Sequence, residues 1–354
     1  MSIPAGRRSF LKAGSVAVVG AALPGRTAWT FAEQRPRIGI IGGGLAGVSC
    51  AWLLDAVADC VLFEDRPSLG GNANTIPVLV GGRWILVDVG AQFFSGGSHP
   101  TYTRLLEIIG LLDPDRPQQD ATIDAQMTIT LGESGVPLPR FVSPAAGRLW
   151  PLLASWNQPA LGAFLVFSQA AKQLCQDGDW LLPLDAWLTA LPVAPEQREG
   201  LLRPLVAAMV GCSLEQTGAL SARSAVTFVG SALPDNPLEP FRYSNSLLGL
   251  GGNVQYLAGL CHNLISHAGS PVVSLEPRPP GGYFIRNAAG TSEPVDAVIF
   301  AAPPYVVSPL LSGMPELADA ALALDDLEYF STQISIHRDP LYMPASPQIG
   351  RAHV

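Results

Sequence analysis

A glycine-rich run followed about twenty residues later by an acid carries the clearest chemical signal in this chain. Gly42, Gly44 and Gly47 occupy the three glycine positions of a G-x-G-x-x-G pattern. In such a pattern the first glycine permits a tight turn, the second lets a pyrophosphate approach the backbone, and the third allows a helix to pack closely on a strand. Glu64 can accept hydrogen bonds from ribose hydroxyls, and with Asp65 beside it would repel a 2′-phosphate. The pattern predicts dinucleotide binding and disfavours NADP.

The elements around these residues are the ones that such a site needs. A short apolar β-type run at 37–41 leads into the glycines, and a second at 61–63 ends at Glu64. Between them, apolar residues recur at helical spacing from Leu45 onward. A helix beginning here presents unpaired N–H groups and a partial positive charge to phosphates. We therefore count Leu45 and Ala46, at its start, among the cofactor-binding residues.

The next segment favours FAD over NAD. Residues 64–75, Glu-Asp-Arg-Pro-Ser-Leu-Gly-Gly-Asn-Ala-Asn-Thr, resemble the E-x-R-x-x-x-G-G-R-x-x-T run of the flavin amine oxidase superfamily. That superfamily also holds polyamine oxidases, protoporphyrinogen oxidases and carotenoid desaturases. The resemblance implies that Gly70 and Gly71 bring a second loop to the FAD pyrophosphate. Asn72 stands where the family usually has Arg, so its phosphate contact lacks a charge and is weaker.

A predicted hairpin leads into a third segment. Apolar runs at 78–80 and 84–87 flank two glycines, which is a hairpin signature. The exit, Asp-Val-Gly-Ala-Gln-Phe, resembles the family's D-x-G-A/G-x-aromatic segment. The resemblance implies that Gly90, Ala91 and Gln92 lie against the isoalloxazine ring. A strand that simply ends in a small-residue turn remains an alternative.

The last resemblance lies late in the chain. Residues 295–303, Val-Asp-Ala-Val-Ile-Phe-Ala-Ala-Pro, resemble a strand of the family that ends beside the cofactor, at Ala301. Val272 matches an earlier strand whose valine contacts adenine through its backbone. The resemblance therefore implies an α/β fold with a Rossmann-like FAD-binding domain that is split in the sequence by a mainly helical, α+β substrate domain.

The chain is predicted to divide into six parts: a signal peptide at 1–32, the two FAD-binding parts at 36–95 and 248–305, the substrate domain at 96–247, a second substrate-domain segment at 306–348, and an artefact of DNA sequencing at 349–354.

The middle of the chain carries no strong motif. Apolar residues recur in helix-like fashion at 148–172 and 181–210, and a strand is predicted at 127–131. The resemblance implies an apolar cavity over the flavin. Tryptophans in this region could line that cavity, although core packing is the commoner role of such residues: Trp150, Trp156, Trp180 and Trp187. A membrane-facing patch at 164–167 is also conceivable, but a buried helix is the better interpretation.

The resemblance implies that the flavin performs the chemistry, by accepting a hydride at N5 from a small organic substrate. Many amine oxidases of this family place a lysine near N5. The resemblance places Gln333 at that position in this chain, and Lys172 lies in the wrong region. No spacing identifies a catalytic histidine. The family's final Gly-rich FAD segment has no counterpart at 310–354, so we expect the chain as written to bind FAD poorly or not at all.

The composition and the two ends of the chain indicate which partners the protein has. Charged residues make up 14% of the chain and the net charge is −8, which argues against a nucleic-acid binder. Scattered cysteines suggest no metal site.

The N-terminus resembles a twin-arginine signal, because Arg7-Arg8 precede Phe-Leu-Lys and a short apolar run. The signal predicts export by the twin-arginine machinery to the periplasm or outside the cell, without a stable membrane span. Residues 349–354 resemble the peptide that a DNA-sequencing adapter would encode. We therefore predict that the natural reading frame of the gene continues past about Gln348.

Three hypotheses follow. The first is an amine-oxidase-like, FAD-dependent oxidoreductase. The second is an FAD-dependent desaturase or isomerase acting on an apolar substrate, favoured by the missing lysine. The third is a dinucleotide-binding fragment without turnover.

Overall fold

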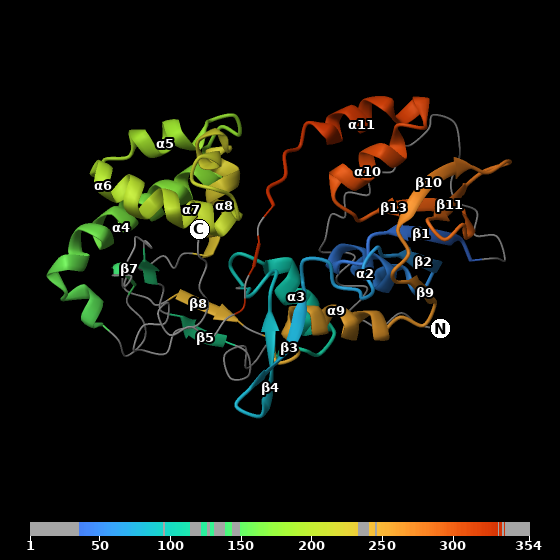
Figure 1. The fold of residues 1–354 in the computed structure, drawn as a ribbon, viewed down its shortest axis with the longest axis horizontal. Helices are drawn as coiled ribbons and strands as arrows, with labels where there is room; N and C mark the ends of the chain where they lie inside the picture. The colour runs from blue at the N-terminus through green and yellow to red at the C-terminus, as the bar shows by residue number, and fades with distance from the viewer. Residues whose placement is uncertain are drawn as a thin grey trace. The chain divides into compact units, whose positions relative to one another are not determined.

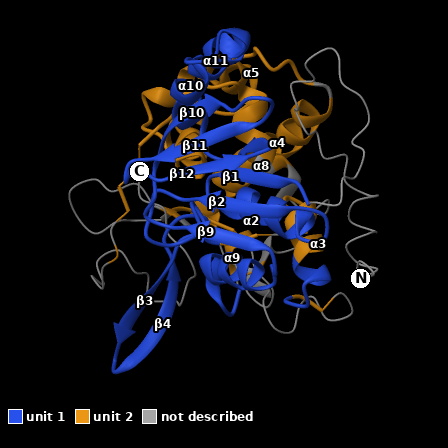
Figure 2. Cartoon of the chain, turned by 90° about the vertical axis from the view of Figure 1, so that its right-hand side faces the viewer, with its two compact units in different colours: residues 1–92, 106–111, 246–328 blue, residues 93–105, 112–245, 329–354 orange. Residues whose placement is uncertain are grey.

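The computed structural model describes residues 35–94, 96–113, 122–125, 128–130, 139–143, 149–232, 241–244, 246–331, 333–334 and 336. The chain divides into two compact units, shown in different colours in Figure 2. Unit 1 comprises 1–92, 106–111 and 246–328, and unit 2 comprises 93–105, 112–245 and 329–354. The predicted signal peptide and the segment at 349–354 lie outside the described residues.

A parallel sheet forms the centre of unit 1 (Figure 1). Its strand order is β13-β1-β2-β9, and every pairing is parallel. The strands are β1 (Arg37–Ile41), β2 (Asp59–Phe63), β9 (Leu264–His267) and β13 (Ala297–Phe300). β1 and β2 are almost wholly buried, as expected of short apolar strands in a parallel sheet. Segments more than 200 residues apart therefore complete one sheet, and the predicted α/β, Rossmann-like fold class is confirmed.

Two helices and a second sheet accompany this core. α2 (Leu45–Leu54) connects β1 to β2, and α9 (Gly249–Gly259) lies beside α2. The second sheet is antiparallel: β10 (Val272–Pro277), β11 (Tyr283–Asn287) and β12 (Ser292–Val295). Together with α10 (Pro304–Leu311) and α11 (Ala318–Asp325) it shares a hydrophobic core with β1 and β2. A 3-10 turn, η5 (Pro315–Leu317), joins the two helices.

The predicted hairpin is confirmed. β3 (Thr75–Val80) pairs with β4 (Arg83–Asp88), and the register brings Val80 opposite Arg83. Gly81 and Gly82 both have positive φ, as a two-residue hairpin turn requires. α3 (Pro100–Ile108) follows; its residues up to 105 belong to unit 2 and its last three to unit 1.

Unit 2 is mainly helical, with two small sheets. Its strands are β5 (Thr122–Ala125) with β8 (Phe241–Ser244), and β6 (Thr128–Thr130) with β7 (Pro139–Val142). Its helices are α4 (Gln158–Asp177), α5 (Leu184–Ala190), α6 (Pro195–Gln197), α7 (Arg203–Val210) and α8 (Ala222–Ala232). Shorter turns are η1 (Trp150–Leu152), η2 (Ser155–Asn157), η3 (Arg198–Leu202) and η4 (Gln216–Ala219).

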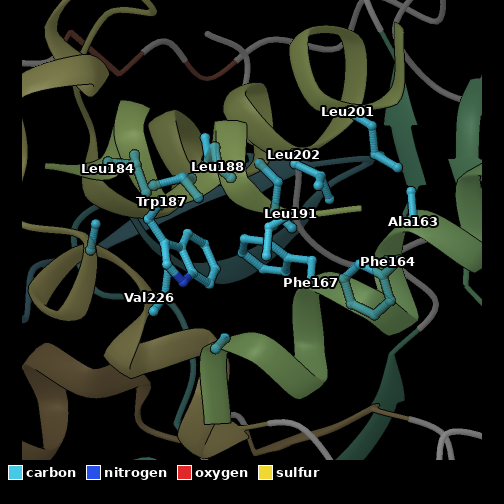
Figure 3. Packing of buried hydrophobic residues seen from close by; sticks show 14 of the residues in the cluster. Ala163, Phe164, Phe167, Leu184, Trp187, Leu188, Leu191, Leu201, Leu202 and Val226 are labelled. Carbon is cyan, nitrogen blue, oxygen red and sulfur yellow. The ribbon is translucent and has the colours of Figure 1, made fainter. Parts of the chain in front are cut away.

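Helices α4, α5, α7 and α8 enclose the core of unit 2 (Figure 3). Phe167 is fully buried and its ring meets Trp187 edge-on at 5.5 Å. The predicted helix at 164–167 is confirmed, and it is buried on one face only: Phe164 is 7% exposed, whereas Leu165 is 38% exposed. The expectation of core packing holds for Trp187 and is wrong for the other three tryptophans, which lie at least 48% exposed in turns: Trp150, Trp156 and Trp180.

The division into units differs from the predicted parts at two main places. Residues 106–111, within the predicted substrate domain at 96–247, belong to unit 1. α10 and α11 belong to unit 1, although 306–348 was assigned to a second substrate-domain segment. Their apolar faces pack on β10 and the parallel sheet, which explains why they cluster there. The functional assignment of the parts stays a prediction. Within the described residues, no helix combines the length and apolar character needed to span a bilayer.

Candidate functional site

The site begins at the turn that follows β1. Gly42 has a φ of +112°, and a Cβ there would lie 2.5 Å from the carbonyl oxygen of Ala301. Ala301 in turn donates its N–H to the Ile41 carbonyl at 2.8 Å. A Cβ on Gly47 would overlap the Gly42 carbonyl oxygen. The turn is thus closed between α2 and the end of β13, and only glycine fits at these two positions.

The N-terminus of α2 points out of this turn without a side-chain cap. Gly44 is the N-cap residue, and the first turn contains no acidic side chain. The opening N–H groups of a helix, here those around Leu45 and Ala46, have no intrahelical acceptor. Together with the helix dipole they favour a bound anion.

A second glycine loop lies directly against the first. Gly70 donates its N–H to the Gly43 carbonyl at 2.9 Å. Gly71 has a φ of +58°, and a Cβ there would lie 3.1 Å from the Gly44 Cα. The Arg66 guanidinium donates to the Gly71 carbonyl at 3.0 Å, which fixes the loop. The two backbones therefore approach to a distance that side chains would prevent.

The third predicted segment contacts the second loop. Ala91 donates its N–H to the Asn72 carbonyl at 2.8 Å, and a Cβ on Gly90 would overlap that same oxygen. Gln92 follows as the last residue of this stretch of unit 1 and is half-buried. Residues 42–47, 70–72 and 90–91, with Ala301, thus form one continuous patch of small residues, which we call the glycine patch.

Glu64 anchors the glycine patch from the end of β2. Its side chain is 6% exposed; Oε2 accepts the Gly43 N–H at 2.7 Å and Oε1 accepts the Arg66 N–H at 3.0 Å. Burial raises the pKa of Glu64, and a hydrogen bond shared with Asp65 raises it further. The same shared bond lowers the pKa of Asp65. The two backbone N–H bonds fix the Glu64 side chain at the end of β2, where the sequence predicts a ribose acceptor.

The segment before β10 lies beside Glu64. Ser270 donates its N–H to the Glu64 carbonyl at 2.8 Å, and Glu64 donates its own N–H to the His267 carbonyl at 3.0 Å. The His267 ring stacks on Phe63 with ring centroids 5.1 Å apart. Val272 opens β10 two residues after Ser270. The predicted adenine-side residue is thus brought close to the predicted ribose-side residue.

Sequence reasoning missed two side chains that join the glycine patch to α9. Asp88 Oδ1 accepts the Leu250 N–H at 2.9 Å, and Thr75 Oγ1 accepts the Gly251 N–H at 2.8 Å. Thr75 Oγ1 also donates to Asp88 Oδ1. The signal lay in their positions, because Thr75 ends one resembling segment, Asp88 begins the next, and the hairpin register places them opposite each other.

No side chain with an obvious catalytic role joins the glycine patch. His262 lies at the far end of α2, where its Nδ1 is 3.3 Å from Asp55 Oδ2, and burial lowers the pKa of His99 in unit 2. Lys172 lies within α4, and Gln333 is exposed. Among the described residues, no cluster of three or more His, Cys, Asp or Glu side chains could hold a metal ion.

Comparisons with known proteins agree with this architecture. Residues 40–109 match a family model described as an NAD(P)-binding Rossmann-like domain. A protein assigned as a protoporphyrinogen oxidase from Exiguobacterium sp. 255-15 superimposes with a TM-score of 0.50 at 18% identity, over 80% of this chain and 63% of that one. Wild-type putrescine oxidase bound to putrescine gives a TM-score of 0.52 at 16% identity, over 78% and 60%. The chain thus spans less than two thirds of either structure. No curated protein sequence matches it.

Proposed function

We propose that this chain is an FAD-dependent, amine-oxidase-like oxidoreductase that removes a hydride from a small organic substrate. The observation that carries the proposal is the contact of three glycine-bearing backbone segments beside the uncapped start of α2. A Rossmann turn alone would serve any dinucleotide. The second loop at 70–72 and the third segment at 90–91 extend the patch in the way that the resemblance to flavin amine oxidases implies.

The residues present fit the ADP half of FAD. The α2 N-terminus offers unpaired N–H groups and no competing acid, which suits a pyrophosphate. A Cβ built on Gly44 would lie 3.8 Å from the Gly71 Cα, its nearest neighbour, so the second glycine leaves space for a phosphate. Gly70 and Gly71 would hold the pyrophosphate from the other side. Arg66, whose guanidinium donates to the Gly71 carbonyl, brings a positive charge to this loop, and Asn72 stands where the family usually has an arginine.

Glu64 would bind the ribose of the adenosine. Its two oxygens accept one backbone N–H each and share one hydrogen bond with Asp65, which leaves one lone pair for a ribose hydroxyl. Asp65 beside it adds a negative charge that opposes a 2′-phosphate. The backbone near Val272 would meet the adenine, and Gly90, Ala91 and Gln92 would lie along the flavin. FAD, when bound, supplies the hydride acceptor.

Unit 2 would then supply the substrate pocket. Its helical core and mainly apolar composition support an organic substrate with apolar parts. Gln333 in place of a lysine supports the second candidate, a desaturase or isomerase acting on an apolar substrate. A dinucleotide-binding protein without turnover is the remaining alternative. Export by the twin-arginine route fits a flavoprotein, because that route carries folded proteins and a cofactor stabilises only the folded state.

A substrate screen separates these candidates. The gene is read through to its native stop codon, and the purified product is mixed without oxygen with amines, polyamines and apolar polyenes. Bleaching of the flavin spectrum by an amine, with peroxide release on admitting air, supports an oxidase. Bleaching or turnover with polyenes alone supports the second candidate. A flavin that no compound reduces would contradict an oxidoreductase.

A further inference from the structure

The β3–β4 hairpin exposes an unusual amount of apolar surface. Trp84 is 70% exposed, Leu86 50%, Leu79 47% and Ile85 46%. In Figures 1 and 2 the hairpin extends away from the rest of unit 1, with its turn uncovered. Cβ atoms added at Gly81 and Gly82 would meet nothing within 4 Å. Contiguous exposed apolar surface of this kind marks an interaction site.

Both faces of the hairpin are apolar. The register pairs Leu79 with Trp84 and Pro77 with Leu86, so these four side chains share one face. Val80 and Ile85 lie on the opposite face and are also exposed. A protein partner that docked on one face would leave the other in water. A medium that surrounds the tip would cover both.

The hairpin is poorly suited to pairing with another strand. Pro77 lies in the middle of β3 and has no N–H, so a strand added along that edge would lack a ladder hydrogen bond. A second copy of this chain would also bring a second net charge of −8. Both features disfavour self-association through the hairpin.

The charge at the tip is complementary to phosphate. Arg83 is the only charged residue between Thr75 and Asp88, and it adjoins Trp84 at the turn. Arginine side chains reach from apolar surroundings to polar head groups, and tryptophan rings favour the membrane–water interface. The tip therefore combines apolar side chains with one interfacial cation.

We propose that the tip of this hairpin inserts into the interfacial layer of a lipid bilayer, with Leu79, Trp84 and Ile85 against the acyl chains and Arg83 at the phosphates. A strand advances about 3.3 Å per residue, so the three steps from Pro77 to Val80 reach about 10 Å. Interfacial segments bury about 5–10 Å into the boundary between head groups and acyl chains. Water and head groups at this depth can satisfy the open strand edges. This surface contact is independent of the FAD proposal.

Quenching by brominated lipid tests the contact at Trp84. The full chain is mixed with phosphatidylcholine vesicles whose acyl chains carry bromine, and tryptophan fluorescence is compared for wild type, Trp84→Phe and Trp180→Phe. Trp180 is the matched control, since it is 58% exposed in unit 2. We expect the lipid-dependent quenching to fall in Trp84→Phe and to persist in Trp180→Phe. Equal quenching in both variants would overturn the proposal.

Vesicle flotation tests the energetic contribution of the hairpin. Leu79→Ser combined with Leu86→Ser should weaken vesicle binding by about tenfold or more, because leucine burial drives insertion. The control, Leu153→Ser with Leu181→Ser, alters side chains that are 84% and 86% exposed in unit 2 and should float like wild type. The apolar run at 13–23 is the same in every variant. Equal flotation of the two double variants would contradict insertion. Insertion would also be contradicted if the wild type did not float with vesicles but formed a dimer, and the hairpin double variant were a monomer.

Discussion

Glu64 shows at the scale of one residue how the site is built. Its carboxylate is buried, yet it accepts two backbone N–H groups, from Gly43 in the glycine turn and from Arg66 in the following loop. One side chain thus holds two loops in place and keeps carboxyl oxygens beside the predicted ribose. Burial raises its pKa because the charged form loses solvation.

Glu64→Gln should lower the free energy of unfolding at neutral pH by about 1 kcal/mol, because one amide oxygen cannot replace two carboxylate acceptors without loss. The pH dependence has a definite sign. A raised pKa means that the folded state gains stability on protonation, and that this contribution is lost as pH rises through the raised value. The advantage of wild type over Glu64→Gln should therefore grow as pH falls from 7 towards 4.5, the ordinary value for this side chain.

Urea denaturation of both proteins at several pH values measures this difference. The lowered pKa of Asp65 keeps that neighbour charged across the window, so the change belongs to Glu64. A difference that stayed constant or shrank on acidification would contradict the buried carboxylate.

At the scale of elements, α9 depends on the base of the hairpin. Thr75 and Asp88 accept hydrogen bonds from its first N–H groups; Thr75 is the first residue of β3 and Asp88 the last residue of β4. A negative side chain at a helix N-terminus is favourable for both its hydrogen bond and its charge. This contact connects the second glycine loop to the helix beside α2.

Thr75→Val removes the hydroxyl while keeping the shape of the side chain. We expect a loss of about 1–2 kcal/mol in the free energy of unfolding, since the Gly251 N–H loses its acceptor and Asp88 loses a donor. Thr75→Ser retains the hydroxyl and should cost clearly less. Thermal denaturation gives both values, and faster hydrogen exchange at the Leu250 and Gly251 amides would locate the effect. Equal stability of the two variants would exclude the capping role.

The sequence allowed the local parts of this arrangement to be predicted, but not the distant ones. The turn at Gly42 and the acid at Glu64 follow from spacing, because a tight strand-to-helix turn and a ribose acceptor require those residue types. The contact between Asp88 and Leu250 joins residues 162 apart, and no local pattern specifies it. Exposure of Trp150 and Trp180 likewise depends on tertiary packing that helical spacing does not determine.

At the scale of the whole molecule, each unit has its own hydrophobic core. In unit 2 the core is centred on Phe167, Trp187, Leu188 and Leu202 (Figure 3). In unit 1 the parallel sheet packs against β10–β12 and the last helices. The two cores support different proposed tasks, substrate enclosure and nucleotide binding.

Phe167→Ala should destabilise the protein by about 3–5 kcal/mol, because a fully buried ring leaves a cavity that the surrounding helices cannot fill. Leu165→Ala is the matched control on the same helix; its side chain is 38% exposed, so the loss should be below about 1 kcal/mol. Chemical denaturation followed by tryptophan fluorescence measures both. Similar losses in the two variants would contradict the core of unit 2.

The flavin content of the gene product, read from source DNA through to its native stop codon, is the decisive test of FAD binding. We expect a yellow protein that releases FAD on denaturation. We also expect Gly47→Ala, whose new methyl group would overlap the Gly42 carbonyl, to be colourless. Gly162→Ala, at a helical glycine with nothing within 4 Å, should retain the flavin. A folded, colourless wild-type protein that takes up no FAD when offered it would contradict FAD binding.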